Sequence, residues 1–361
     1  MSIRKIILSM HRWMGLILGI WLLLQVLTGA VLNFEDNIIS DIPSGDLVRL
    51  DEKPVGSILA ILERDFSEHQ LLRIEYPPVG KSSFIVRTQH NTSKKEHYNK
   101  YLPSSDQFIE FDLFEYATIW LFKFHEELLI KKTGHYIVGL LGLALFLWVL
   151  SGLYLWWPSG KKRALNISWQ GSYRMQLYDL HRVIGVLVSI FLLIISITGI
   201  GMSYRTKLLE VFDSAKAIPA ASMKEQSLLS CVQHNEIDIT INCLAKTAGI
   251  SSVKDIRFNA HQEQIQILLY ASDHSRSLAV DTVVFSAKEA EKNRVNLAIE
   301  ENISETVLNW MYPLHTAKVM GTFGKFIMFI VSLMTSLLIV IGWLIWWDKK
   351  RGQKHETKIR T

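Results

Sequence analysis

Histidines at the start of long apolar runs are the residues of this chain whose type and spacing point to chemistry. His11 opens the run HRWMGLILGIWLLLQVLTG, and His181 opens the matching run HRVIGVLVSIFLLIISITG. Each run carries Thr-Gly at its end, with Thr28 in the first and Thr198 in the second. An ionisable side chain within a membrane-length apolar run is costly and marks a functional site by default. We therefore expect His11 and His181 to serve one function together.

A second set of histidines precedes the other two apolar runs. His125 and His315 occupy corresponding places, since the residues that follow them also align, and His135 opens the first of these two runs. Histidines at opposite ends of one span would lie roughly 20–30 Å apart at about 1.5 Å per residue. Pairing must therefore join the two halves of the chain. We expect His11 to pair with His181, and His315 to pair with His125 or with His135.

Two imidazoles that converge from facing helices suit the two axial positions of a haem iron. The spacing His-x3-Gly recurs, and it places a small residue one turn along the same helix face, where a flat macrocycle would need room. The glycines at this spacing are Gly15, Gly185 and Gly139. Small residues at such spacings also pack membrane helices together without any cofactor. Glycines alone do not decide between a haem site and helix packing. We favour haem because placing a histidine within an apolar span costs free energy and therefore indicates a function.

Other uses of the histidines have less support. A zinc site would require cysteine or carboxylate ligands grouped with the imidazoles. Glu126 and Glu127 follow His125 directly, which leaves a metal or proton site open at that position. A proton relay would more often show acidic residues within the spans themselves. The chain also has no glycine-rich phosphate-binding motif, so it offers no nucleotide site of its own.

Four apolar runs would position these histidines, and each is long enough to cross a bilayer, which takes about 20 residues. They cover residues 13–34, 136–157, 183–204 and 325–347. Lysine and arginine cluster near the N-terminus, in the loop 158–180 and in the C-terminal tail, which places all three in the cytoplasm. The net charge of +5 thus gathers at membrane edges rather than in a binding stripe. We therefore expect contact with membrane lipid and no nucleic-acid partner.

The two long connections lie outside, and each has the pattern of a small α+β module. Helical spacing covers 54–66 and 238–248, and strand-like alternation covers 71–76, 83–88, 107–112, 253–259, 264–271 and 277–284. Cys231 and Cys243 are the two cysteines of the chain, and an oxidising compartment favours a disulfide between them over two free thiols. The predicted fold is an α-helical membrane protein of two tandem helix–module–helix repeats. Its segments are helix 1 (1–34), module 1 (35–120), an interfacial segment with helix 2 (121–157), a cytoplasmic loop (158–180), helix 3 (181–204), module 2 (205–312), an interfacial segment with helix 4 (313–347) and a cytoplasmic tail (348–361).

These motifs resemble those of the PepSY-associated transmembrane family. The resemblance rests on HRWMG…LTG and HRVIG…ITG, on FHEELL…GHYIVGL, and on the endings SGLYLWW and IGWLIWW, so it covers nearly the whole chain. It implies PepSY-like outer modules, four transmembrane helices and two b-type haems, as in inner-membrane siderophore–iron reductases of Gram-negative bacteria. His11, His181, His125 and His315 match the histidines of the family motifs. His135 stands where a basic residue such as arginine is expected, and both it and His125 stay candidates for the outer ligand.

The predicted function is that of an oxidoreductase with two haem b groups in a bacterial inner membrane. His11 and His181 would ligate the inner haem, and His315 with His125 or His135 the outer one. By resemblance, electrons would pass from an external donor, a quinol or a cytoplasmic reductase, to a ferric siderophore or another ferric chelate in the periplasm. The alternatives are a non-enzymatic regulator or transporter accessory subunit with PepSY-like modules, and a cytochrome b-like subunit linked to quinol. The sequence identifies no catalytic residue beyond these ligands.

Overall fold

The protein divides into two compact units, and each is described by itself. The computed structural model describes residues 2–35, 54–77, 83–157, 165–212, 231, 239–241, 243–244, 253–259, 264–270, 280–286, 294–296 and 303–360. The helical unit comprises Met1–Glu35, Ile119–Glu210 and Trp310–Thr361, and the sheet unit comprises Asp36–Thr118 and Val211–Asn309. The chain passes between them after Glu35 and within three shorter helices, α4 (Leu113–Glu127), α7 (Arg205–Phe212) and α10 (Ile303–His315).

Four long helices form the helical unit, and all four are long and apolar enough to cross a membrane. They are α1 (Ile3–Leu32), α5 (Lys131–Trp156), α6 (Tyr173–Ser203) and α11 (Gly321–Arg360). The four predicted spans are thus confirmed as helices, and the protein is a multi-pass α-helical membrane protein. Helix α6 begins before the predicted boundary at residue 181, because the Ser172 hydroxyl caps it by accepting a hydrogen bond from the backbone N–H of Met175.

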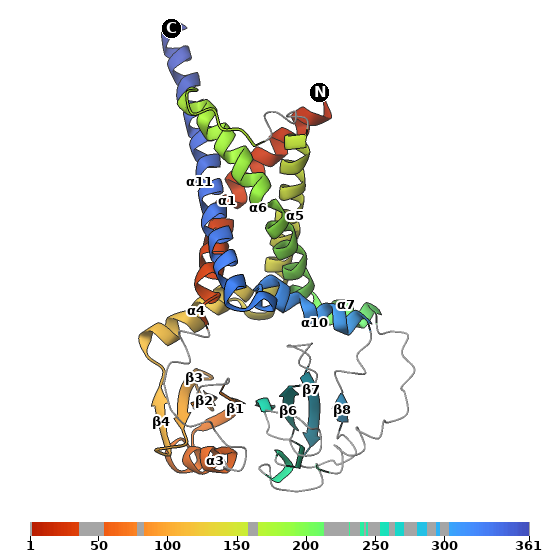
Figure 1. Ribbon diagram of the computed structural model, residues 1–361. Coiled ribbons are helices and arrows are strands. Elements are labelled where there is room, and N and C mark those ends of the chain that lie inside the picture. Colours follow the sequence, from red (N-terminus) through yellow and green to blue (C-terminus); the bar gives the residue numbers. More distant parts are fainter. Residues whose placement is uncertain are drawn as a thin grey trace. The chain divides into compact units, whose positions relative to one another are not determined.

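The packing order of the four helices decides which residues can face each other. Helix α1 packs against α5 and α11, and helix α6 packs against the same two neighbours. Consequently α1 and α6 lie diagonally across the bundle, as do α5 and α11. The N-terminus of α1 and the C-terminus of α11 lie at one end of the bundle, and α4 and α10 lie at the other (Figure 1).

Each of the helices α4 and α10 carries a histidine at its end. A reciprocal capping box starts α4: the backbone N–H of Glu115 donates to Asp112 Oδ1, and the backbone N–H of Asp112 donates to Glu115 Oε2, both at 2.9 Å. After His125 the chain turns into α5 through left-handed residues, Leu128, Leu129 and Lys131. After His315 it turns through the left-handed Ala317 and the short 3₁₀ helix η4 (Lys318–Met320) into α11.

The sheet unit contains one antiparallel sheet in the order β4-β3-β2-β1-β5-β6-β7-β8. Its described elements are α3 (Pro54–Asp65), β1 (His69–Glu75), β2 (Phe84–His90), β3 (Glu96–Leu102), β4 (Gln107–Glu110), β5 (Val253–Phe258), β6 (Gln264–Tyr270), β7 (Val280–Ser286) and β8 (Arg294–Asn296). The prediction of the 54–66 helix and of six strands is confirmed, with shifts of a few residues at their ends. Strands β3 and β8 were not predicted. The predicted helix at 238–248 lies mostly outside the described residues.

The strands of the two predicted modules meet in the middle of this sheet. Strand β1 pairs antiparallel with β5, and Ile74 lies opposite Ile256 with both side chains fully buried. On the other face of the two strands, the buried carboxylate of Asp255 accepts hydrogen bonds from Arg73 at 2.7 Å and from Arg257 at 2.8 Å. Buried carboxylates need such partners. The seam is therefore apolar on one face and ion-paired on the other.

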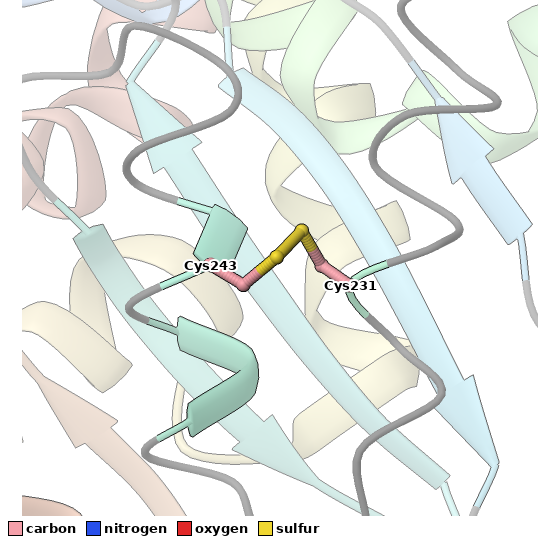
Figure 2. Close-up of a disulfide and its surroundings, with 2 residues drawn as sticks. All are labelled: Cys231 and Cys243. Atoms are coloured by element: carbon pink, nitrogen blue, oxygen red, sulfur yellow. A yellow bond between two sulfur atoms is a disulfide. The ribbon is translucent and has the colours of Figure 1, made fainter.

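The predicted disulfide between Cys231 and Cys243 is confirmed (Figure 2). The two Cα atoms are 5.5 Å apart, and Cys231 is fully buried in the core of the sheet unit. Ile241 and Leu244 beside Cys243 are buried in the same core. The bridge therefore joins two positions 12 residues apart, both of which contribute to the core of the sheet unit.

Candidate functional site

His11 and His181 come together across the helical bundle. His11 lies on α1 and His181 on α6, and their ring centroids are 6.3 Å apart with the ring planes at 87°. Trp148 of α5 flanks His11 at a centroid distance of 5.9 Å. The facing of these two histidines follows from the diagonal placement of α1 and α6, since corresponding positions on the two helices meet at one depth.

His125 and His315 form a second pair with nearly the same geometry. Their ring centroids are also 6.3 Å apart, and the ring planes meet at 71°. Gln25 of α1 donates a hydrogen bond from Nε2 to the backbone carbonyl of His125 at 3.1 Å. This bond fixes the main chain of α4 against α1. The second pair therefore lies near the ends of α1 and α6 that are opposite to the first pair.

The separation within each pair suits a metal ion between the two rings. Two imidazoles that ligate one metal ion from opposite sides, at metal–nitrogen distances of about 2.0–2.1 Å, would have ring centroids about 6 Å apart. Both pairs show 6.3 Å. The residues present thus fit a cofactor that takes two axial histidines, as haem does.

Hydroxyl groups orient three of the four rings through Nδ1. The hydrogen-bonded pairs are Ser151 Oγ with His11 Nδ1 at 2.8 Å, Thr28 Oγ1 with His125 Nδ1 at 3.0 Å, and Thr198 Oγ1 with His315 Nδ1 at 2.9 Å. Each hydroxyl hydrogen is already donated to a carbonyl of its own helix: Ser151 to Trp148 O at 2.6 Å, Thr28 to Leu24 O at 2.9 Å and Thr198 to Ile194 O at 2.7 Å. A hydroxyl has one hydrogen, so each oxygen accepts from the histidine.

The direction of these bonds fixes the tautomer of the three histidines. Because Nδ1–H is the donor, Nε2 keeps its lone pair and is available to a metal ion. Histidines that ligate metals almost always donate their other ring N–H to an acceptor in this way. A histidine that only packs in a core would not require an oriented Nε2, yet both His125 and His315 of one facing pair have one, as does His11 of the other.

Glycines on the neighbouring helices make room for all four rings. A Cβ atom built on these glycines would meet the imidazole Cε1 at 3.2 Å for Gly152 and Gly29, which is closer than a side chain ordinarily packs, and at 3.4 Å for Gly342 and Gly199, which is at the near limit of ordinary contact. The pairs are Gly152 with His11, Gly342 with His181, Gly29 with His125 and Gly199 with His315. Each histidine is therefore seated against bare backbone of an adjacent helix, and the pattern is the same in all four places.

The glycines that follow His11 pack against tryptophan rings of neighbouring helices, whereas we expected them to line an open face beside the haem. A Cβ on Gly15 would lie 2.9 Å from the indole of Trp148, and a Cβ on Gly19 would lie 2.9 Å from the indole of Trp343. Gly139 likewise receives the ring of Tyr204. These glycines pack α1 against α5 and α11, and α5 against α6. Close helix packing, the alternative reading of the spacing, accounts for them.

His135 does not join the facing rings. Its Nε2 lies 3.8 Å from a carboxylate oxygen of Glu127 and 4.0 Å from one of Glu126, at the start of α5. In the part of the chain that the structure describes, no group of three or more histidine, cysteine, aspartate or glutamate residues is arranged to hold a metal ion. The geometry thus brings His125, and not His135, opposite His315.

The residues that orient the histidine rings could have been identified from the sequence. Thr28-Gly29 and Thr198-Gly199 were recognised as repeated pairs, but without a role. Each pair supplies a hydroxyl to Nδ1 and a bare backbone to the ring edge of one histidine. Ser151-Gly152 does the same for His11. A hydroxyl residue directly before an aligned glycine was therefore the informative pattern.

The comparison with protein families agrees with the sequence motifs. The family described as the PepSY-associated TM region matches residues 8–349, which spans all four histidines of the two pairs. No curated protein matches the chain. With four membrane-length helices and a match over nearly its whole length, the chain belongs to the PepSY-associated transmembrane family.

Proposed function

We propose that this protein is a membrane reductase that carries electrons through two b-type haems. His11 and His181 ligate the inner haem, and His125 and His315 ligate the outer haem. The observation that carries the proposal is the pair geometry: two sets of facing imidazoles, both at 6.3 Å between ring centroids. Three of these four rings are held by hydroxyl groups that leave Nε2 free.

The residues around each pair bind and orient, and the cofactor brings the redox chemistry. When bound, haem supplies one-electron transfer. With both histidines of a pair as its ligands, a haem would keep no open position on the iron, so the sites would suit electron transfer rather than oxygen binding. Glycines such as Gly152 and Gly29 let the rings approach the neighbouring helices, and the hydroxyls of Ser151 and Thr28 set the ring rotation. The chain thereby fixes ligand identity, orientation and basicity.

We infer the direction of electron flow from the expected membrane topology. The lysine and arginine clusters at the N-terminus, in the loop 158–180 and in the tail favour cytoplasmic termini in a bacterial inner membrane. His11 and His181 then lie toward the cytoplasm, and His125 and His315 toward the outside. The disulfide in the sheet unit agrees with an oxidising outer compartment. Electrons would enter from a quinol or a cytoplasmic reductase and leave to a ferric siderophore or a similar ferric chelate.

We infer that an internal duplication is the reason why the two histidines within each pair have corresponding positions and similar surroundings. We infer two helix–module–helix repeats, in which α1 corresponds to α6 and α5 to α11, with PepSY-like modules between the helices of each repeat. The diagonal packing of α1 and α6 supports this inference, as does the correspondence of Gly152 with Gly342 and Gly29 with Gly199. The single sheet would then contain four strands from each repeat.

Two measurements on the purified protein test this function. An absorption spectrum of wild-type protein, produced with ample haem, should show bis-histidine haem, and His181→Ala should lose about one haem per chain. Vesicles that contain the protein and a reduced donor inside should reduce a ferric chelate outside, and His181→Ala should abolish this activity. A wild-type protein without haem would end the reductase proposal and favour a non-enzymatic regulator or accessory subunit. A haem-loaded protein that reduces no ferric chelate would remove the substrate assignment alone.

A further inference from the structure

The four histidines differ in one respect that the duplication does not predict. His11, His125 and His315 each donate from Nδ1 to a hydroxyl. The Nδ1 atom of His181 is buried and has no hydroxyl partner and no hydrogen bond of good geometry among the described residues; the acceptor that it faces is the backbone carbonyl of Leu338. The exception therefore lies in the inner pair, opposite His11.

The cause is a single residue difference between the two halves of the chain. The ring of His11 lies against Gly152, and Ser151 directly before this glycine supplies the hydroxyl. The ring of His181 lies against Gly342 in the same way, but the preceding residue is Ile341, which has no polar atom. Ile341 is 3% exposed and packs with Ile184 of α6 and its apolar neighbours. The hydroxyl is thus replaced by a well-packed aliphatic side chain.

A hydrogen bond from Nδ1–H makes an imidazole a more basic ligand, and such contacts tune the metal that it holds. A more basic axial ligand stabilises ferric over ferrous iron, so second-shell hydrogen bonding is one of the levers on haem potential. The outer pair has two such bonds, from His125 to Thr28 and from His315 to Thr198. The inner pair has one.

We propose that Ser151 and Ile341 make the two ligands of the inner haem inequivalent, and that this raises its reduction potential above the value that two hydrogen-bonded histidines would give. This inference rests on the proposed haem sites. Ser151 and Ile341 are positioning residues, because neither would contact the haem iron. Each would affect the iron only through the histidine beside it, His11 or His181. At the outer haem, Thr28 and Thr198 accept hydrogen bonds from both histidine ligands, so its reduction potential is that of a haem with two hydrogen-bonded histidines.

The test compares two nearly isosteric replacements of Ile341. Ile341→Thr introduces a hydroxyl next to His181, with the Leu338 carbonyl one turn back as its acceptor, as Trp148 O serves Ser151. Ile341→Val makes the same reduction in size without the hydroxyl and is the matched control. Ser151→Ala is the converse change, because it removes the one bond that His11 makes. All three are made in the full-length protein, and each is also combined with His315→Ala so that only the inner haem remains.

The readout is the midpoint potential of the inner haem in a spectroelectrochemical titration. We expect Ile341→Thr to lower this potential relative to Ile341→Val, and Ser151→Ala to raise it relative to wild type. A tenfold change in the ferric-to-ferrous equilibrium corresponds to about 59 mV for one electron. We expect shifts up to that size, with the outer haem unchanged in the variants that retain it.

The possible outcomes separate this inference from the proposed function. Haem-loaded variants whose inner potential differs neither between Ile341→Thr and Ile341→Val nor between Ser151→Ala and wild type would overturn the inference and leave the haem sites standing. If Ile341→Thr fails to fold, the Ser151→Ala result decides: a raised potential supports the inference, and an unchanged one overturns it. A wild-type protein without haem would overturn both.

Discussion

Replacing Thr28 with valine should weaken the outer haem site while leaving the fold intact. Valine has the shape of threonine, so the substitution removes the hydroxyl and little else. Thr28 is 8% exposed, and its Oγ1 accepts from His125 Nδ1 at 3.0 Å. Gln25 still holds the backbone carbonyl of His125 at 3.1 Å, so the ring stays near its place. What is lost is the partner of one buried N–H donor.

The size of the effect follows from the cost of that unpaired donor. A buried donor without an acceptor costs about 1–3 kcal/mol, which is roughly a 5- to 150-fold change in an equilibrium constant. Loss of a similar supporting contact typically weakens metal binding about 10- to 100-fold. We therefore expect Thr28→Val to raise the dissociation constant of the outer haem about 10- to 100-fold. Haem per chain is measured by absorbance during dilution into apomyoglobin, which captures released haem.

Thr335→Val is the matched control for this prediction. Thr335 is 1% exposed on α11, and its hydroxyl donates to Val331 O at 2.7 Å. It is thus a buried threonine whose hydroxyl serves its own helix, whereas Thr28 also serves His125. The reasoning is wrong if Thr28→Val retains haem as well as Thr335→Val does.

Three further predictions address other parts of the structure. His135→Ala should keep both haems, because His135 faces Glu126 and Glu127. If absorbance spectra of the variant show that the outer haem is lost, His135 is a ligand after all. Gly152→Ala should weaken the inner haem several-fold, because its Cβ would press on His11 at 3.2 Å and overpacking costs about 1–3 kcal/mol. Gly185→Ala is its control, since the nearest atom to that Cβ is 3.6 Å away; equal haem retention by the two variants would refute the steric argument. Burial, together with the neighbouring His97 and His90, lowers the pKa of His69 below its ordinary value of 6.5, so the unfolded chain binds this proton more readily. The sheet unit should therefore lose stability as the pH falls below about 6.5 toward the folded pKa, and thermal unfolding of His69→Gln should show a smaller pH dependence.

The pairing of histidines was predictable from the sequence because corresponding residues of two aligned apolar runs that cross a membrane in the same direction lie at the same depth. Once His11 aligned with His181 and His125 with His315, the membrane thickness excluded pairing within one half. The choice between His125 and His135 was not predictable, since both stand near the same end of the same span. It depends on the left-handed turn between α4 and α5, which directs His135 toward Glu126 and Glu127.

The glycines show why a spacing pattern can be right in position and wrong in role. His11-x3-Gly15 correctly marked a helix face that needs small residues. The side chains that fill the space come from other helices, as Trp148 and Trp343 do, and no local pattern names them. The glycines that seat the rings, such as Gly152 and Gly29, lie far from their histidines in sequence and became informative only with the helix packing order.

Local sequence patterns could not predict that the strands of both segments form a single sheet. Alternation predicted strands in both outer segments, but it does not say which edges meet. The join depends on β1 and β5, where Ile74 and Ile256 are buried on one face and Asp255 lies between two arginines on the other. A charge on a strand is ordinarily expected to face solvent. Asp255 is buried instead, because Arg73 from the other half of the chain pairs with it together with Arg257 of its own strand.

Counting haem in paired substitutions tests the central claim most directly. If His11 and His181 share one haem, the double variant His11→Ala with His181→Ala should keep one haem per chain, as each single variant does. His11→Ala combined with His125→Ala should keep none, because it removes one ligand from each site. A His11–His181 double variant that holds two haems or none, or a His11–His125 double variant that still holds one, would contradict the account.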